Sequence, residues 1–196
     1  MATALVEPLA PSSPRLLTVA DLAAMPSELP SGSVKYELDN GRLILLAPPG
    51  DDHGRTQYRV GIALFSHAEK RGLGEGRTEV GVILRRNPDR VVGSDAVFIA
   101  KRSLPARVSR EGYLETIPEL VVEVRSKNDT LEDLRDKAQE YLQAGVQIVW
   151  IIEPAAKTVT VYRPNESPLQ LHDGDVLTAK GVIPRFKVPV AELFSA

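Results

Sequence analysis

The stretch that decides the fold of this chain is IPELVVEVRS, residues 117–126. Its run of β-branched apolar residues is typical of a strand buried on both faces of a sheet. Glu123 lies in the middle of that run, where a carboxylate is costly unless a cation, a proton or hydrogen bonds compensate its charge. Because side chains alternate along a strand, Glu123 and Arg125 are expected on the same face. The first question is therefore what Glu123 holds.

The segments that follow predict a helix and a second buried strand. Thr130 with Asp133 resembles a capping box, and Gly145 is a typical helix stop, so a helix is expected over residues 131–144. Leu134, Ala138, Tyr141 and Leu142 form the apolar stripe of this helix. Lys137 lies on the edge of that stripe, from which its side chain can reach solvent or a neighbouring site. The apolar run at 146–153 predicts a strand, which completes a right-handed parallel β-α-β unit.

Two hairpins and a helix are expected before that unit. Asn40-Gly41 between apolar segments predicts a hairpin. A helix is expected next, followed by a second hairpin around Asn87-Pro88-Asp89. The expected bounds are a short helix at 18–25, a loop at 26–33, strands at 34–38 and 42–46, a helix from 51–53 to about 71, strands at 78–86 and 90–99, a loop at 102–117, strands at 158–163, 169–171 and 182–186, and a final helical turn at 190–194.

Composition places the chain among ordinary globular proteins. Its 196 residues suffice for one domain with a core, and 43% of them are hydrophobic. We expect residues 1–15, rich in proline, alanine and serine, to be disordered and not a secretory signal, and residues 16–196 to form a single domain. There is no cysteine, which excludes disulfides, zinc–thiolate sites and cysteine nucleophiles and fits a cytoplasmic location. No apolar run is long enough to span a membrane.

Charge is balanced over the whole chain but not locally. The formal net charge is -2, whereas residues 85–110 contain seven basic and two acidic residues. Such a cluster can face phosphates, with Arg85, Arg86 and Arg90 as candidate nucleic-acid contacts. The alternative interpretation is a solvated rim around a strand.

Three carboxylates stand where an apolar residue would be the less costly choice. Glu37 lies in the first hairpin, Asp95 in the second, and Glu123 in the central strand. Clustered carboxylates suit a hard cation such as Mg²⁺ or Mn²⁺, which prefers oxygen ligands. The alternative is a buried salt-bridge network with Arg125 or Lys137 as partner. His53 is a further candidate base or ligand, although a histidine at a helix start is more often a cap or surface residue.

The order and spacing of these motifs resemble those of a known family. Asp95 and then Glu123 follow the PD-(D/E)XK pattern of restriction-endonuclease-like nucleases, and the whole chain resembles the family of putative restriction endonucleases within that superfamily. The resemblance runs from about residue 17 to 194. The matching stretches are Tyr36-Glu37-Leu38, Asn40-Gly41 and Leu43, His53-Gly54, Ser94-Asp95-Ala96-Val97-Phe98, residues 118–124 with Ser126, Asp133-Leu134 with Lys137, Tyr141-Leu142 with Gly145-Val146, and Val149-Trp150 with Pro154.

The resemblance implies an α/β fold with a restriction-endonuclease-like three-layer core, in which helices flank a mixed β-sheet with β-hairpin additions. It implies that Asp95 and Glu123 bind the metal, with the backbone carbonyl of Val124 as a third ligand. Glu37 matches the acidic residue that binds metal directly or through water.

The lysine of the family pattern is displaced in this chain. Its usual place, two residues after Glu123, holds Arg125, and an arginine stays protonated and is a poor general base. The resemblance assigns the role to Lys137 on the following helix, with Lys127 as a competitor. Ser94 replaces the usual proline before Asp95.

The function expected from these observations is a Mg²⁺-dependent DNA endonuclease in which the metal and a lysine activate the attacking water. Cleavage of both strands would call for a homodimer, with the exposed hairpins as a possible interface. The alternative is a non-catalytic nucleic-acid-binding or regulatory module that keeps the nuclease fold. A third interpretation is a structural subunit of a mobile-element or toxin system.

Overall fold

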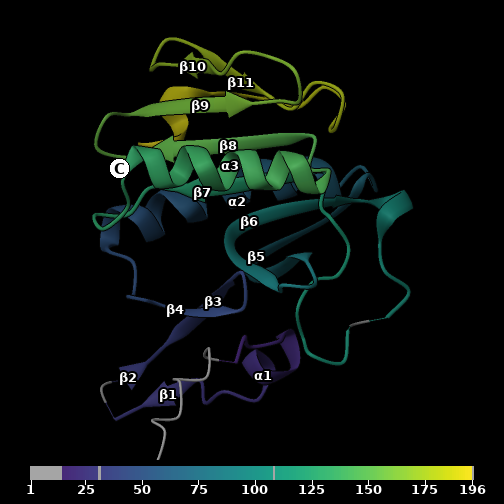
Figure 1. The fold of residues 1–196 in the computed structure, drawn as a ribbon. Helices are drawn as coiled ribbons and strands as arrows, with labels where there is room; N and C mark the ends of the chain where they lie inside the picture. Colours follow the sequence, from purple (N-terminus) through teal and green to yellow (C-terminus); the bar gives the residue numbers. More distant parts are fainter. Residues whose placement is uncertain (1–14, 31, 108, 196) are drawn as a thin grey trace, which may run out of the picture.

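A mixed β-sheet with helices on both faces forms the body of the chain in the computed structural model (Figure 1), which describes residues 15–30, 32–107 and 109–195. The elements are α1 (Val19–Ala23), β1 (Glu28–Leu29), β2 (Gly32–Ser33), β3 (Lys35–Asp39), β4 (Arg42–Leu46), α2 (Asp51–Glu69), β5 (Gly74–Arg85), β6 (Arg90–Ala100), η1 (Lys101–Ser103), β7 (Leu120–Val124), α3 (Leu131–Ala144), β8 (Ile148–Glu153), β9 (Thr158–Tyr162), β10 (Leu169–Leu171), β11 (Val176–Thr178), β12 (Lys187–Pro189) and η2 (Val190–Leu193).

The main sheet has eight strands within the described residues. Seven of them follow the order β10-β9-β8-β7-β6-β3-β4, and β5 pairs with β6. Only β7 and β8 are parallel among these pairs, and α3 connects them, which confirms the predicted β-α-β unit. A mixed sheet flanked by helices is the α/β architecture expected from the sequence. None of the described helices has the length and apolar character needed to cross a membrane.

The two helices cover opposite faces of the sheet. In Figure 1, α3 crosses in front of β7 and β8, while α2 lies behind the sheet. Alternation along β7 explains the division, because Val122 packs in the core cluster that includes α2 and Val121 in the cluster that includes α3. Glu123 has the same parity as Val121, so it points toward α3. The face of the sheet thus determines which helix can supply a partner for Glu123.

The sheet opens along one side of β6. On that side β6 pairs with β3 at Val91 and with β7 from Ala96 to Phe98, so none of the described strands pairs with residues 93–95 there. Side chains bind the backbone instead: the N–H of Gly93 donates to Glu37 at 2.9 Å, and its carbonyl accepts from Lys137 at 3.0 Å. The candidate site therefore lies where β3 and β7 diverge from one strand.

Local sequence signals explain why the helices and hairpins begin and end where they do. Thr130 and Asp133 form the expected capping box of α3, and Gly145 ends the helix with a positive φ of 111°. The first hairpin turns at Asn40-Gly41, where both residues have positive φ as a tight hairpin turn requires. Most elements thus match their expected bounds.

Two expected segments differ. The strand expected at 182–186 is wrong: positive φ angles at Gly181 and Arg185 form turns, and the C-terminal ribbon pairs β11 with β12 instead. The apolar residues of this segment serve the core, as when Phe186 stacks on Trp150. The loop expected at 26–33 contains the short hairpin β1–β2. The disorder expected at 1–15 falls almost wholly on residues 1–14, outside the described part, and the single-domain boundary stays a prediction.

Candidate metal centre

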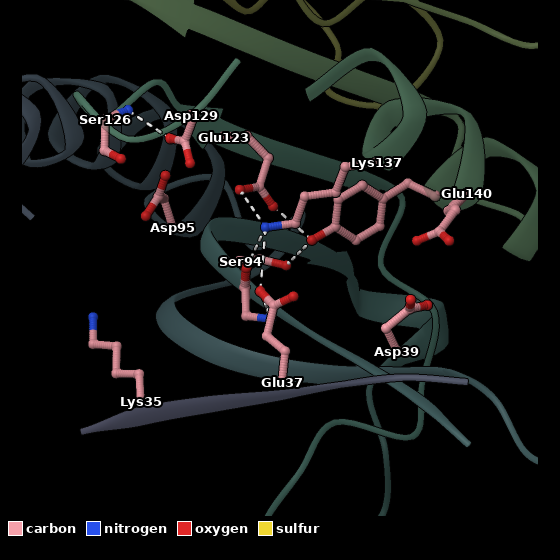
Figure 2. A network of polar contacts seen from close by, with 12 residues as sticks. Lys35, Glu37, Asp39, Ser94, Asp95, Glu123, Ser126, Asp129, Lys137 and Glu140 are labelled. Atoms are coloured by element: carbon pink, nitrogen blue, oxygen red, sulfur yellow. Dashed lines mark hydrogen bonds and ion pairs between the residues drawn. The ribbon is translucent and has the colours of Figure 1, made fainter. Parts of the chain in front are cut away.

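Lys137 on α3 is the centre of a buried polar network (Figure 2). Its ammonium donates to Glu123 at 3.0 Å and to Glu37 at 3.4 Å, besides the carbonyl of Gly93. The lysine is 100 residues from Glu37 in sequence and 14 from Glu123. Three separate elements, β3, β7 and α3, therefore bring the predicted residues Glu37, Glu123 and Lys137 into direct contact.

Tyr141 is a further partner of Glu123 on the same helix. Its hydroxyl donates to Glu123 at 2.6 Å, and the hydroxyl of Ser94 lies 2.8 Å from it. Burial and the neighbouring Glu123 raise the pKa of Tyr141 well above its ordinary value, so the phenol keeps its proton. Since that proton is donated to Glu123, Ser94 donates in turn to Tyr141. Both oxygens of Glu123 are thus held by residues of α3.

Burial dominates the electrostatics of this network. Removal from water raises the pKa of Glu123 to about 8, although the charge of Lys137 opposes that shift. For Lys137 burial disfavours the ammonium, but Glu123 and Glu37 outweigh it and raise the pKa above its ordinary value. Lys137 therefore remains a cation at neutral pH.

Asp95 lies at the edge of this network and faces the other helix. One carboxylate oxygen accepts the backbone N–H of Val124 at 2.6 Å, and the other lies 3.0 Å from Nε2 of His53 on α2. With regular alternation, Ser94 and Val97 of β6 would lie on opposite faces of the sheet, because they are three positions apart. Both lie on the side of α3, so the alternation is interrupted between them. Asp95 can for this reason turn toward α2, and it connects Val124 of β7 to that helix.

His53, Glu79 and Asp95 form a second group of possible ligands. Their donor atoms all lie within 4.8 Å of one another. Burial disfavours the imidazolium of His53, but the hydrogen bond and charge of Asp95 outweigh it and raise the pKa above its ordinary value. Gln57 on α2 donates to both Glu79 (2.7 Å) and the carbonyl of Asp95 (2.8 Å) and so fixes their spacing. Asp95 belongs to this group and, through the N–H of Val124, lies next to the strand position of Glu123.

The site opens into a strongly acidic cleft of about 950 Å³. Nine carboxylates line it, against two lysines and one arginine. The carboxylates belong to Glu37, Asp39, Glu79, Asp95, Glu123, Asp129, Asp133, Asp136 and Glu140. Such a cleft attracts cations and repels a phosphodiester unless a cation is bound first.

Several sequence-predicted residues lie elsewhere or have other partners. Arg125 pairs with Glu153 at 3.0 Å and donates to the carbonyl of Asp129, so it does not take the position of the missing lysine beside Glu123. Lys127 is exposed on the turn after β7. The N–H of Val124 donates to Asp95 at 2.6 Å, and its carbonyl stays a predicted ligand.

The candidate nucleic-acid contacts divide into two groups. Arg85 and Arg86 are exposed near the end of the second hairpin. Arg90 is only 8% exposed and its guanidinium pairs with Glu140 at 2.7 Å and with Glu37 at 3.5 Å. A phosphate contact would require Arg90 to leave these partners, so only the two exposed arginines are kept as candidate contacts.

Sequence reasoning missed three residues that complete the site. Tyr141 was assigned to the apolar stripe of its helix, yet its position four residues after Lys137 puts both on the side of α3 that faces Glu123. Ser94 was noted only as a replaced proline. Glu79 carried no signal in the sequence, because its role depends on a positive φ of 54° inside β5 and on the partner Gln57.

Comparison with solved structures gives the class of fold. The chain is similar to a crystal structure described as a putative nuclease belonging to DUF820 from Anabaena variabilis ATCC 29413, with a TM-score of 0.75 and 17% sequence identity. The match covers 91% of this chain and 97% of that one. The fold is therefore that of a nuclease-like α/β protein. No functionally curated protein matches the sequence.

The family follows from the sequence itself. Residues 19–191 match the Uma2 family, described as "Putative restriction endonuclease". Because the match spans most of the chain, this protein belongs to the Uma2 family. The resemblance inferred from the motifs is confirmed.

Proposed function

We propose that this chain is a metal-dependent phosphodiester hydrolase that cleaves nucleic acid, with DNA as the expected substrate. The observation that supports this most strongly is the convergence of Glu37, Asp95, Glu123 and Lys137 around one acidic cleft. They come from β3, β6, β7 and α3, so local sequence cannot explain the cluster. A family of restriction-endonuclease type and a nuclease-like fold agree with this activity.

The donor set fits a divalent cation. Asp95 and Glu123, with the carbonyl of Val124, supply oxygen ligands of the kind that Mg²⁺ prefers, and Glu37 is close enough to act directly or through water. His53 and Glu79 extend the set on the other side of Asp95, and an imidazole ligand favours Mn²⁺ over Mg²⁺. When bound, such an ion would lower the pKa of a water molecule and stabilise charge on the phosphate.

Lys137 contributes a fixed positive charge rather than a base. Its raised pKa keeps the ammonium protonated, and its position between Glu37 and Glu123 lets it orient water and stabilise negative charge on a phosphate. A lysine can activate water by orienting it or by removing its proton, and the raised pKa of Lys137 supports the first role. Tyr141 and Ser94 hold Glu123 in place for it.

The acidity of the cleft makes nucleic-acid binding depend on metal. With nine carboxylates around the site, a phosphodiester backbone meets repulsion until a divalent cation offsets it. Arg85 and Arg86 are the proposed backbone contacts outside the cleft. Homodimerisation and a cytoplasmic location remain predictions.

The activity is tested by nicking of supercoiled plasmid and cleavage of labelled oligonucleotides in Mg²⁺ or Mn²⁺. We expect cleavage by the unmodified chain and a loss of roughly 10²–10³-fold in Asp95→Asn and in Glu123→Gln, the range seen when a charge-stabilising group is removed. Exposed acids away from the cleft provide matched controls, namely Asp173→Asn and Glu166→Gln, which should retain full activity.

Two outcomes would contradict the proposal in different ways. Equal cleavage by Asp95→Asn and the unmodified chain would show that the site is misplaced or that the activity is a contaminant. Salt-dependent DNA binding with no cleavage in any divalent metal would favour the alternative, a binding module that keeps the nuclease fold.

A further inference from the structure

Helix α2 buries one apolar face, and among the described residues two large apolar side chains on its other side stay exposed. Val60, Leu64 and Ala68 are fully buried against the sheet. On the opposite side Tyr58 is 65% exposed and Ile62 is 48% exposed. Surface helices normally present a polar face to solvent. The outward face of α2 therefore has the character of an interface.

A groove of about 610 Å³ continues this outward face. It runs between α2 and β5 and is lined by Tyr58, Ile62 and Phe65 together with Gly54 and Gly61. Phe65 packs over Gly76 of β5, where a Cβ would lie 2.0 Å from the ring. The groove is thus formed by packing within the chain, and its apolar lining is accessible.

Contacts among the described residues require neither glycine of α2, although Gly61 is buried. A Cβ at Gly54 would meet nothing within 4 Å, and one at Gly61 would meet only Phe65, at 3.4 Å or more. A glycine inside a helix costs roughly 0.5–1 kcal/mol relative to alanine. Gly54, Tyr58, Gly61 and Phe65 repeat at spacings of four, three and four residues, which is the spacing of a helix–helix seam. Small residues along such a seam allow a second backbone to approach closely.

Charge along the helix indicates which partner fits. The first turn of α2 is acidic (Asp51, Asp52), whereas basic residues stand beyond its last turn (Lys70, Arg71). In an antiparallel pair of these helices, the acidic first turn of one copy would lie beside the basic end of the other. The two helix dipoles would then point in opposite directions, which is also favourable. If the two-fold axis passes Ile62, Arg55 of one copy lies opposite Glu69 of the other, twice by symmetry.

Nucleic acid fits this surface less well. Glu69 and Glu79 both line the groove, and Glu69 is held there because it accepts the N–H of Gly76 at 3.1 Å. Fixed carboxylates repel a phosphate backbone, whereas Glu69 suits an arginine of a second copy.

From the apolar seam and the self-complementary charges we infer that two copies of this chain associate through α2, packed antiparallel about Ile62. The interface differs from the hairpins named from the sequence. It also borders the candidate metal centre, because two residues that line the groove belong to both. Gln57 donates to the carbonyl of Asp95, and Glu79 forms the group of possible ligands with His53 and Asp95. The association is independent of whether the chain cleaves nucleic acid.

Sedimentation velocity of the full chain over a concentration series tests the association. We expect a species of twice the 21.4 kDa chain mass, and Ile62→Asp should weaken the dimer at least tenfold. Leu45→Asp on the first hairpin and Leu169→Asp on β10 are matched controls, since both leucines are 57% exposed; they should leave the dimer intact. Circular dichroism confirms that each variant is folded.

Two further variants test the geometry. The chain has no cysteine, so an Ile62→Cys variant should be linked to its copy by a short bismaleimide, whereas a Leu169→Cys variant should not. Arg55→Glu and Glu69→Arg should each weaken the dimer, and the double exchange should restore it.

A monomer at all concentrations would overturn the inference, as would loss of the dimer in Leu45→Asp but not in Ile62→Asp. A monomer whose binding to single-stranded DNA is weakened by Tyr58→Ala would assign the groove to nucleic acid instead.

Discussion

Helices α2 and α3 cover opposite faces of the same sheet but differ in what their polar and apolar residues do. Helix α3 has a capping box and a glycine stop, buries Leu134 and Ala138, and directs Lys137 and Tyr141 to Glu123. Helix α2 has no side-chain cap hydrogen bond at Gly50, contributes His53 and Gln57 to the site, and leaves Tyr58 and Ile62 exposed. The polar residues of α3 that face the sheet have partners among the described residues, whereas α2 leaves two large apolar side chains exposed there.

We interpret this difference as a division between residues of the proposed site and residues of the inferred interface. On α3, each polar group that enters the sheet finds a partner, so a change there alters the site itself. On α2, the inward face contacts the core and the site, and the outward face carries Tyr58 and Ile62 of the inferred interface. The predictions below test this division, from the largest expected effect to the smallest.

The largest effect is expected for Lys137→Met. Removal of the ammonium leaves Glu37 and Glu123 without their shared cation, so cleavage should fall by roughly 10²-fold or more. Single-turnover cleavage of a labelled oligonucleotide measures the loss. Lys180→Met changes an exposed lysine of the C-terminal segment and should leave the rate unchanged. Full activity in Lys137→Met would remove this lysine from the site.

Metal affinity should depend on pH through Glu123. Its carboxyl has a pKa raised to about 8, so below that pH a proton must leave before the carboxylate can bind metal. Affinity should therefore increase about tenfold per pH unit as pH rises toward 8, and level off above it. Calorimetric titration of Mn²⁺ between pH 6 and 9 measures this slope. The slope should flatten in Glu123→Gln, and an unchanged slope there would assign the titration to another group.

The phenol of Tyr141 should contribute mainly to stability. Tyr141→Phe removes the hydrogen bond to Glu123 and the partner of Ser94, both in the core, and should lower the free energy of unfolding by about 1–3 kcal/mol. Tyr58→Phe on the exposed face of α2 should change it by less than about 0.5 kcal/mol. Urea denaturation compares the two, and equal effects would contradict the contrast between the helices.

Two glycine substitutions should have opposite signs. Gly145→Ala places a side chain at a φ of 111° and should destabilise α3 by about 1 kcal/mol. In Gly54→Ala the added Cβ has no described neighbour within 4 Å, and the change should raise the free energy of unfolding of the monomer by roughly 0.5–1 kcal/mol. Thermal unfolding at low protein concentration measures both. A destabilised monomer in Gly54→Ala would mean that this glycine serves the chain itself.

The parts of the fold that sequence predicted are those governed by local signals. The capping box at Thr130 and Asp133, the stop at Gly145 and the Asn40-Gly41 turn all act within a few residues. The strand predicted at residues 182–186 was wrong because its apolar residues carry no local signal that separates a strand from a turn. Buried side chains such as Phe186 satisfy a core contact from a turn as well as from a strand, and apolarity alone does not distinguish the two.

The candidate site shows the same limit. Glu37, Asp95 and Glu123 were identifiable because a carboxylate in an apolar strand is costly. Lys137 was identifiable only through the family resemblance, which assigns to it the role of the lysine that is missing two residues after Glu123. Their partners were less visible. Tyr141 looked like a core residue, and Arg125 looked like the partner of Glu123 but pairs with Glu153.

By itself, the sequence determined the central strand, its embedded carboxylate and the β-α-β unit around it, because strand alternation and helix caps are local physics. Only the tertiary structure decided which cation meets Glu123, since Lys137 reaches it across the opening between β3 and β7. It also decided that Asp95 turns toward His53 and Glu79. Contacts between residues from different elements depend on how the sheet divides and bends, and no short stretch of sequence encodes that geometry.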